Sequence, residues 1–517
     1  MLGASILVSL ATVLVSGINF LAQVVLAWKF GATSSMDIYL IAISVPMFIS
    51  GVLSVGLSYS LVPALLSYER QGHSYRQFSG LLFLGFLFMA AIIAGLGYLV
   101  TPWQIHIFGP LLSKLQVAEA VSVARISWVT AGVMVLIAYL RGLQNSQQHF
   151  LFPAFAIAVP SLCVIFAGLL TTASVRPDCI AWAMLLGFVI LVPVLLISSY
   201  TYMDLSSRSF QALPGVKNYL FQLPLIVLAV LCFTAFQASD SYWAPQLGEG
   251  RLAHLSYCQR LVVSIGNLVI AGPAAVVLPR LSNAHVEGRA QDLLADSERV
   301  IRLVLACCLP VAVYVSVVAE PAISLLFERG AFTQQDTREV ADLLPWMMIG
   351  MVPMLCVVMI FRAIFARQEI LWAAGIGCLT SALYFGLSGW LSDSFGALGI
   401  AIAYAGTWWI VFLISLCALW RGRLRQLTHR TNVGFIGKLV LALAVTGSIG
   451  FISNDWFIQS NASSSTLIFR LVVVALASAV CYIGLAILIR IDEIRLLLSF
   501  LRQNLGPRLK LFKHGKS

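Results

Sequence analysis

The sequence predicts an all-α polytopic membrane protein, and composition, helix-length apolar segments and the placement of basic residues are the observations that predict it. Of the 517 residues, 60% are hydrophobic and only 10% are charged, whereas soluble globular domains carry roughly 25% charged residues. A soluble protein of this composition would expose large apolar patches, which a lipid bilayer covers instead. The net charge of +11 does not indicate nucleic-acid binding, because the basic residues are not gathered with aromatic residues on a polar face.

Helix-length apolar segments are the second observation. A spanning helix takes about 20 predominantly apolar residues, and fourteen segments of the chain meet that test. They are approximately 5–28, 38–66, 79–102, 117–141, 150–172, 179–203, 219–243, 252–279, 300–320, 340–364, 370–392, 396–420, 435–453 and 466–490. Gly and Pro interrupt several of them, as at Pro46 and Pro273. Such breaks often mark the substrate-facing helices of transporters.

Basic residues, the third observation, give the expected orientation. With the N-terminus in the cytoplasm, the cytoplasmic segments hold 23 Lys and Arg and the outer loops hold seven. Cytoplasmic loops of membrane proteins carry an excess of Lys and Arg. The sequence therefore predicts a multi-pass protein of a bacterial inner (plasma) membrane with both termini cytoplasmic. The basic C-terminal tail is expected to anchor the last helix against anionic lipids.

Cysteines and histidines predict neither a metal site nor catalysis. The ten cysteines fall almost all within apolar runs without a CxxC pair, which is typical of small buried hydrophobic residues. The seven histidines are scattered over loops and helix ends on both sides. A membrane glycosyltransferase would need clustered carboxylates or histidines at one interface to activate a hydroxyl, and no such cluster is evident. We therefore expect no enzyme activity, no cofactor and no metal.

An internal repeat indicates the domain organisation. The stretches Gly31–Ser67 and Gly248–Ser282 share a Gly-containing outer turn, a long interrupted helix and a Pro-x-Leu type exit. Two such stretches in the same orientation predict a parallel repeat about an axis along the membrane normal. The expected parts are an N-terminal lobe at 1–216, a C-terminal lobe at 217–430, and two further helices with a basic tail at 431–517.

Several motifs together resemble those of one transporter family. LFERGAFT at 326–333, followed by Asp336 and Thr337, resembles the outer-loop signature of the MurJ (MviN) lipid II flippases, approximately L-F-x-R-G-x-F-T-x-x-D-T. FARQ at 365–368 and LPRLS at 278–282 are similar to that family's F-Y-A-R-Q and L-P-x-L-S. Residues near the start that follow the family's order and spacing are Phe30, Gly31, Ala32, Asp37, Pro46, Val62 and Pro63. The resemblance covers the chain from about residue 15 to 420.

This resemblance implies a flippase with two six-helix lobes around a central cavity and two last helices that form a lipid-facing groove. Alternating access would move the head group of a polyprenyl-pyrophosphate-linked glycan, while the polyprenyl tail stays in lipid. The expected partners are that glycan, membrane lipids and enzymes of envelope synthesis, with no nucleic acid. Coupling to the membrane potential or to a monovalent cation is expected in place of a cofactor.

The chain departs from the family's pattern in its first two helices. Lipid II flippases carry an S-R-x-x-G-x-x-R-like pattern in helix one, where the stretch Ser16–Gln23 has no arginine. In helix two they carry paired arginines and then an acidic-glycine pair, where this chain has Ser50-Gly51 and Val55-Gly56. Two substrates therefore stay open. The loop signatures favour lipid II, and the missing arginines favour another polyprenyl-linked repeat unit destined for exopolysaccharide, capsule or O-antigen.

Polar residues within the spans are the candidate substrate contacts. A charge at the centre of a spanning helix costs roughly 2.5–3.5 kcal/mol, so it invites a functional explanation. Arg260 matches a family arginine, and a guanidinium offers bidentate donors to phosphate oxygens. Arg125 is a second candidate cation, with snorkelling to the interface as the alternative. The remaining candidates, for which interhelical hydrogen bonds are the alternative, are Asn19, Gln23 and Gln259.

Charged residues near helix ends are the candidates for ion coupling and gating. Asp240 is expected to pair with Arg251 or Arg260, or to bind a coupling cation or proton. Asp37 is expected to cap the start of the second helix, where an acid is favourable.

The outer loop with the clearest family motif supplies three further candidates, Glu328, Arg329 and Asp336, with substrate contact as the alternative to a gating or loop-shaping role. Gly330 predicts a tight turn there, and Thr333 predicts a helix cap with Asp336 in the first turn. On the cytoplasmic side, Arg362 and Arg367 are candidate gate residues, with anchoring at the interface as the alternative.

Two non-enzymatic alternatives remain. A multidrug exporter of the same superfamily usually has twelve helices, so the two extra C-terminal spans favour a lipid substrate. A non-transporting scaffold in an envelope-synthesis complex would gain little from broken helices or intramembrane arginines.

Overall fold

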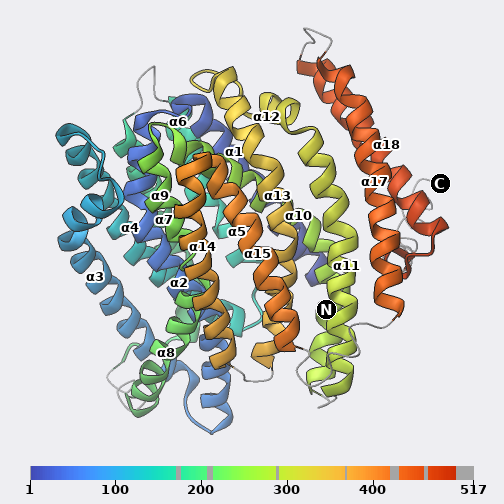
Figure 1. Ribbon diagram of the computed structural model, residues 1–517. Helices are drawn as coiled ribbons and strands as arrows, with labels where there is room; N and C mark the ends of the chain where they lie inside the picture. Colours follow the sequence, from blue (N-terminus) through green and yellow to red (C-terminus); the bar gives the residue numbers. More distant parts are fainter. Residues whose placement is uncertain are drawn as a thin grey trace, which may run out of the picture. The chain divides into compact units, whose positions relative to one another are not determined.

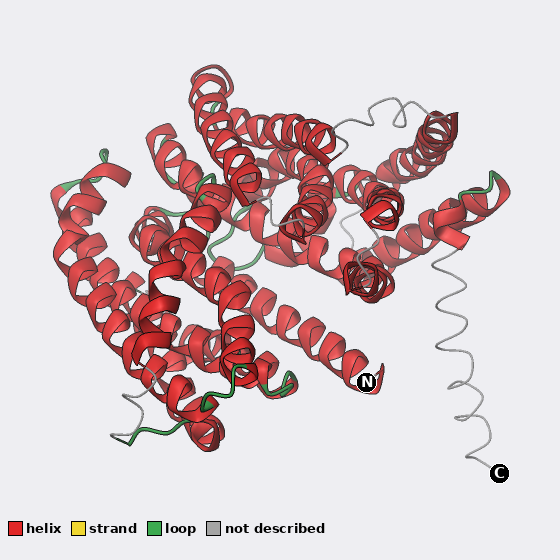
Figure 2. Cartoon of the chain, turned by 90° about the horizontal axis from the view of Figure 1, so that it is seen from below, coloured by secondary structure: helices red, strands yellow, loops and turns green. Residues whose placement is uncertain are grey.

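The computed structural model describes residues 2–170, 176–206, 213–286, 290–366, 370–419, 430–458 and 464–495. Helices make up nearly all of these residues, and the described part of the chain contains no strand (Figure 2). The elements (Figure 1) are α1 (Leu2–Phe30), α2 (Ser34–Arg70), α3 (Tyr75–Phe108), α4 (Lys114–Ser146), α5 (Leu151–Ala156), α6 (Ala158–Leu170), α7 (Pro177–Ser199), η1 (Tyr200–Tyr202), α8 (Leu213–Thr234), α9 (Gln237–Trp243), η3 (Ala244–Leu247), α10 (Arg251–Val286), α11 (Ala290–Val317), α12 (Ala319–Phe327), α13 (Gln334–Ala366), α14 (Ile370–Phe395), α15 (Ala397–Leu419), α17 (Arg430–Ile458) and α18 (Ser464–Leu488).

The all-α membrane fold predicted from the sequence is confirmed. Twelve helices within the described residues are long and apolar enough to cross a membrane, and Gly434–Ile449 is a shorter apolar helix. Each of the fourteen predicted spans coincides with one helix or with two consecutive helices. This agreement follows from the bilayer's requirement that every backbone N–H and C=O group be bonded internally, which a helix meets by itself.

Proline positions explain two of the places where a predicted span is divided into two helices. α5 ends at Ala156 and α11 ends at Val317. The residues four positions later, Pro160 and Pro321, have no N–H to donate to those carbonyl groups. The division between α8 and α9 has no proline. There the amide of Ala238 bonds to the carbonyl of Ala235 at 3.1 Å, a tighter turn than an α-helix makes.

The chain packs as two compact units that are discontinuous in sequence. Unit 1 comprises Met1–Tyr257, Arg329–Asp336 and Gly377–Ile400, and unit 2 comprises Cys258–Glu328, Thr337–Ile376 and Ala401–Ser517. Because both units are discontinuous, the division into lobes at 216 and 430 stays a prediction.

Unit 1 is built around α4, which packs against α2, α3 and α7. Small residues allow the closest approach, since a Cβ at Gly132 would lie 2.5 Å from the carbonyl oxygen of Ala90. The hydroxyl of the fully buried Tyr139 donates to the carbonyl of Ser79 at 2.6 Å. Close packing of small residues and interhelical hydrogen bonds are the usual means of helix association in lipid.

In unit 2, α11, α17 and α18 lie side by side (Figure 1). Their shared apolar cluster consists of Ala306, Phe435, Leu439, Ala442, Tyr482, Ala486, Ile491 and Ile494. The hydroxyl of Tyr482 donates to the carbonyl of Ala306 at 2.6 Å. Arg302 on α11 pairs with Glu298 and lies 3.6 Å from Glu493, which ties the residues after α18 to α11.

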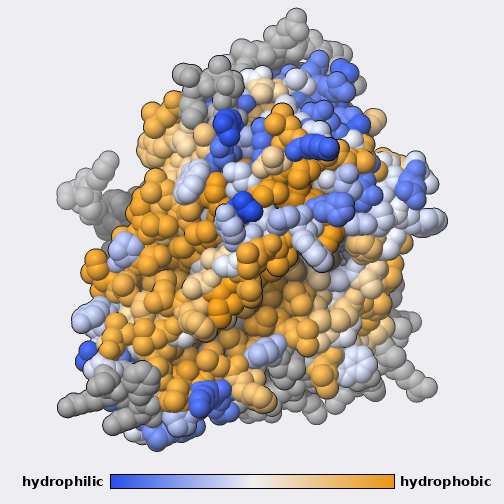
Figure 3. Space-filling model, turned by 90° about the vertical axis from the view of Figure 1, so that its left-hand side faces the viewer, coloured by the Kyte–Doolittle hydropathy of each residue, from blue (hydrophilic) through white to orange (hydrophobic). Residues whose placement is uncertain are grey.

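The molecular surface matches a lipid environment. Figure 3 shows apolar residues over the middle of one face and hydrophilic residues toward its upper and lower edges. On α3, Phe88, Leu99 and Trp103 are 69%, 71% and 74% exposed. Side chains of this kind would be costly in water, and lipid tails cover them at no such cost.

Candidate functional site

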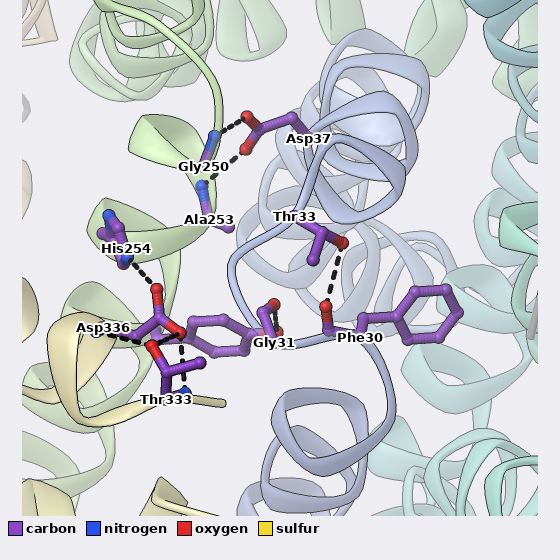
Figure 4. Close-up of polar contacts among 10 residues, drawn as sticks. Phe30, Gly31, Thr33, Asp37, Gly250, Ala253, His254, Thr333 and Asp336 are labelled. Atoms are coloured by element: carbon purple, nitrogen blue, oxygen red, sulfur yellow. Dashed lines mark hydrogen bonds and ion pairs between the residues drawn. The ribbon is translucent and has the colours of Figure 1, made fainter. Parts of the chain in front are cut away.

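Three segments that are far apart in the sequence meet within unit 1 at a site that we call the loop junction (Figure 4). It consists of Trp28–Asp37 at the turn between α1 and α2, Glu249–Tyr257 at the start of α10, and Arg329–Asp336 at the start of α13. The third segment carries most of the outer-loop motif found in the sequence.

Asp37 connects α2 to α10. Its carboxylate is 6% exposed and accepts hydrogen bonds from the amides of Gly250, at 2.5 Å, and Ala253, at 2.9 Å. These amides belong to the N-terminal end of α10, where backbone N–H groups have no partner within the helix and the helix dipole favours an anion. The prediction that Asp37 caps α2 is therefore wrong, because the helix that its carboxylate caps is α10. The residue lies in the first turn of α2 but caps α10.

A second carboxylate makes this capping reciprocal. Glu249, just before α10, accepts a hydrogen bond from the amide of Ser34, the first residue of α2, at 2.9 Å. Each of the two helices thus receives at its N-terminal end a carboxylate supplied by the other. The exchange fixes the start of α2 against the start of α10.

Glycines allow the backbones at the junction to approach each other. Gly31 has φ +57°, and a Cβ there would lie 2.2 Å from the carbonyl oxygen of Ala331. Gly250 has φ +77°, and a Cβ there would lie 2.4 Å from the carbonyl oxygen of Ala32. Both the left-handed backbone and the space exclude other residues. The amide of Ala331 uses this approach to donate to the carbonyl of Trp28 at 2.9 Å.

An aromatic pair packs beneath these contacts. Tyr257 is fully buried, and its ring meets that of Phe332 edge to face with centroids 5.6 Å apart. Its hydroxyl donates to the carbonyl of Gly31 at 2.9 Å, so one side chain contacts both other segments. A buried tyrosine combines apolar contact with a satisfied hydroxyl in this way.

The start of α13 is capped as the sequence predicted. The Thr333 hydroxyl accepts from the amide of Asp336 at 3.3 Å, and the Asp336 carboxylate accepts from the amide and the hydroxyl of Thr333, both at 2.8 Å. The tight turn predicted at Gly330 is also confirmed, with φ +61°. The remaining oxygen of Asp336 contacts His254, a residue that no sequence motif indicated.

Asp240 forms a separate polar site in unit 1. It lies on α9, is 5% exposed, and accepts a hydrogen bond from the hydroxyl of the buried Tyr384 on α14. The ring of Phe236 packs edge to face against that of Tyr384. Tyr384 had not been predicted, because nothing in the local sequence connects residues so far apart.

The candidate substrate contacts fall in several places. Asn19 accepts a hydrogen bond from the hydroxyl of Ser161 at 2.7 Å, an interhelical bond of the kind that was its alternative. Oε1 of Gln23 is buried and has no hydrogen-bond partner in the described part of the chain. The guanidinium of Arg125 lies 4.4 Å from the ring centroid of Tyr98 on α3.

The other candidates lie mainly in unit 2. Arg260 and Gln259 are half-buried on α10. Glu328 accepts from the hydroxyl of Thr337 at 3.1 Å, whereas Arg329 is exposed in the loop junction. Arg362 lies on α13, but its side chain is not described, and Arg367 lies outside the described residues.

Comparison with known proteins decides the family. The family model described as "Lipid II flippase MurJ" matches residues 26–489. The chain belongs to this family. The resemblance read from the motifs is therefore confirmed. Within the described residues, no group of three or more His, Cys, Asp or Glu could hold a metal ion.

Relatives in the MurJ family align along most of their length. A "Probable lipid II flippase MurJ" of Buchnera aphidicola is 24% identical over 459 residues, covering 86% of this chain and 88% of the relative. That of Vibrio cholerae is 24% identical over 485 residues, covering 87% and 88%. The "Lipid II flippase MurJ" of Burkholderia cenocepacia is 24% identical over 379 residues, covering 70% and 73%.

Solved structures support the same fold. A lipid II flippase MurJ in an inward closed conformation superposes with a TM-score of 0.76 at 18% identity, covering 95% of this chain and 100% of that one. An inward-facing multidrug transporter of the MATE family gives a TM-score of 0.64 at 15% identity, covering 80% and 97%. At these identities the likeness shows the fold.

Proposed function

We propose that this protein is a flippase that carries lipid II from the cytoplasmic to the outer leaflet of a bacterial inner membrane by alternating access. The family match across residues 26–489 is the observation that carries the proposal. The relatives from three bacteria bear the name of that activity. The apolar helices and the apolar surface of Figure 3 suit a protein that handles a lipid-linked substrate within the bilayer.

A second candidate substrate is another polyprenyl-linked repeat unit of exopolysaccharide or O-antigen. The observation that favours it is the absence of arginine from Ser16–Gln23 in α1, together with Ser50 and Val55 in α2. A pyrophosphate in a low-dielectric site needs fixed cations. Under either substrate, we assign phosphate contact to Arg260 first and to Arg125 second.

The loop junction is proposed to be the outer gate in its closed state. An outer position of the α1–α2 turn is supported by the excess of Lys and Arg in the segments assigned to the cytoplasm. Gly31, Asp37, Gly250 and Asp336 join three segments there. Each contact is a hydrogen bond or a close backbone approach, so it can break and re-form as a unit during a transport cycle.

Coupling to an ion is proposed at Asp240. A carboxylate that is only 5% exposed is costly when charged, so binding of a proton or a cation at Asp240 would stabilise it strongly. The neighbouring Tyr384 hydroxyl can remain a donor to the charged form. Entry and loss of a proton or cation there would drive a step of the transport cycle other than the opening of the loop junction.

The experiment that tests the proposal is rescue of a bacterium depleted of its own lipid II flippase. The measurement is the amount of lipid II exposed on the outer leaflet, with the protein shown to be inserted and abundant. We expect exposure to be restored by the parent chain and lost with Arg260→Ala. Arg176→Ala is the matched control, because Arg176 is exposed and pairs with its near neighbour Asp178 at 3.1 Å.

Either outcome is informative about the substrate. Restored exposure that depends on Arg260 establishes lipid II transport without the helix-one arginines. No restoration assigns the protein to the second candidate, which rescue of a strain lacking an exopolysaccharide flippase would then show directly.

A further inference from the structure

The segment Arg329–Asp336 packs in unit 1, although α12 before it and most of α13 after it belong to unit 2. Its backbone is seated by Trp28, whose carbonyl accepts from Ala331, and by Gly31, which leaves room for the Ala331 carbonyl. A loop held in this way also needs a side chain that fixes where the following helix, α13, begins. The side chain in position to do this is His254 (Figure 4).

His254 contacts Asp336 with good geometry and little access to water. The residue is 7% exposed, and its Nε2 lies 2.8 Å from Oδ1 of Asp336. A carboxylate can only accept, so Nε2–H must be the donor, and neutral or protonated imidazole can both supply it. The other oxygen of Asp336 already accepts from Thr333. The histidine therefore completes the set of hydrogen bonds that orients the first turn of α13.

The second ring nitrogen of His254 indicates that the bond to Asp336 is the main polar contact of this histidine. Nδ1 of His254 is buried and has no hydrogen-bond partner in the described part of the chain. A buried polar atom without a partner is costly, so an apolar residue would pack more favourably if only bulk were needed. The contact with Asp336 is the feature that a histidine supplies and an apolar side chain does not.

We propose that His254 is the positioning residue of the loop junction. Its Nε2–H bond holds Asp336, and with it the segment Arg329–Asp336, against α10 while the junction is closed, and the bond breaks when the junction opens. This inference rests on the proposed transport cycle, in which the junction opens and closes. Because Asp37, Tyr257 and the Trp28–Ala331 bond also hold the junction, loss of His254 shifts the closed state toward opening without abolishing the fold.

The test measures opening with a reporter thiol at position 253. Ala253 is 0% exposed, and its amide is bonded to Asp37, so Ala253→Cys reacts with a maleimide only when the junction opens. The full-length chain in lipid nanodiscs is labelled, and peptide mapping separates position 253 from the ten native cysteines. No substrate is present, and both membrane faces are accessible.

We expect His254→Ala to raise the labelling rate about 10-fold, which corresponds to about 1.4 kcal/mol. His254→Gln keeps a side-chain N–H of similar reach and should stay within about twofold of the parent, whereas His254→Asn carries the same amide on a shorter side chain and should behave like His254→Ala. His106→Ala, at an exposed histidine on α3, should leave the rate unchanged.

Two results overturn the proposal. One is an unchanged rate in His254→Ala. The other is equal rates in His254→Gln and His254→Asn, which would show that the reach of the donor does not matter. The Gln and Asn comparison decides the question even if His254→Ala does not fold. If the parent chain exposes lipid II but the His254 variants label at the parent rate, only the positioning role is refuted. If the His254 variants label faster but the parent chain exposes no lipid II, only the assignment of lipid II as the substrate is refuted.

Discussion

Two buried carboxylates in unit 1, Asp37 and Asp240, are accommodated in different ways. They are 6% and 5% exposed, so neither is stabilised by bulk water. Asp37 accepts from two backbone amides at the start of α10, whereas Asp240 accepts from the hydroxyl of Tyr384. Backbone amides at a helix N-terminus are fixed in place and carry the positive end of the dipole. A tyrosine hydroxyl is a neutral donor on a side chain that can rotate.

Asp37 is therefore a carboxylate that joins two helices, whereas Asp240 is one whose charge can change. Removal of Asp37 leaves two amides of α10 without acceptors and separates two helices. Removal of the Tyr384 hydroxyl leaves the fold intact but alters the energetic cost of the charge on Asp240. The comparison therefore predicts that changes at the loop junction affect opening most, and that changes near Asp240 affect transport with little effect on opening.

The largest effect is expected for Asp37→Ala. It removes the acceptor of two charge-assisted hydrogen bonds and favours the open junction by about 3 kcal/mol. The change should abolish lipid II exposure in the rescue assay and raise labelling at Ala253→Cys more than any other variant. Asp37→Asn is the matched control, because it retains one acceptor oxygen. Its labelling rate and its lipid II exposure should fall between those of the parent chain and those of Asp37→Ala. An Asp37→Ala chain that still transports at the parent rate would refute the role of the loop junction as a gate.

Gly31→Ala should have the next largest effect. The added Cβ would lie 2.2 Å from the carbonyl oxygen of Ala331, in a backbone with φ +57°. Gly248→Ala is the matched control, because Gly248 has φ +119° but nothing lies within 4 Å of its added Cβ. Backbone strain is present in both and is worth about 1–3 kcal/mol. Only Gly31→Ala should also raise labelling at position 253, and equal labelling in the two variants would show that the close approach is unimportant.

Local and distant determinants explain which parts of the structure the sequence could predict. The helices follow from apolar length, and the Thr333 cap with Asp336 follows from residues three positions apart. The partner of Asp37 could not be predicted in this way, because Gly250 is 213 residues away and donates a backbone amide that any residue but proline would offer. His254 was not predicted because the residue that its side chain contacts, Asp336, is 82 residues away.

Prolines are an ambiguous local signal in this chain. Pro160 and Pro321 each remove the donor for a carbonyl four residues earlier, at the ends of α5 and α11, whereas Pro46 and Pro310 lie inside α2 and α11 without ending them. The contact between Asp240 and Tyr384 offers no comparable local signal, since it joins residues 144 positions apart. The sequence thus predicts the elements and the local cap at Thr333 well, and it predicts interhelical partners poorly.

Tyr384→Phe should have a smaller effect that is confined to transport. It removes the hydroxyl that Asp240 accepts from and keeps the ring contact with Phe236. Loss of a donor to a buried carboxylate costs about 1–3 kcal/mol and favours the neutral or cation-bound form. We expect lower lipid II exposure, with labelling at position 253 unchanged. Increased labelling in Tyr384→Phe would contradict the separation between the two carboxylates.

Arg125→Ala tests the smallest effect and the role of an intramembrane cation. The guanidinium lies 4.4 Å from the ring centroid of Tyr98, a contact worth about 0.5–1 kcal/mol at exposed sites. Tyr98→Leu removes that contact while it leaves the charge. If Arg125 serves the substrate, Arg125→Ala should lower lipid II exposure and Tyr98→Leu should not, although both lower the melting temperature by a similar small amount. Equal, near-parental exposure in the two variants would leave Arg260 as the cation that the phosphate depends on, because the arginines typical of the family's first two helices are missing here.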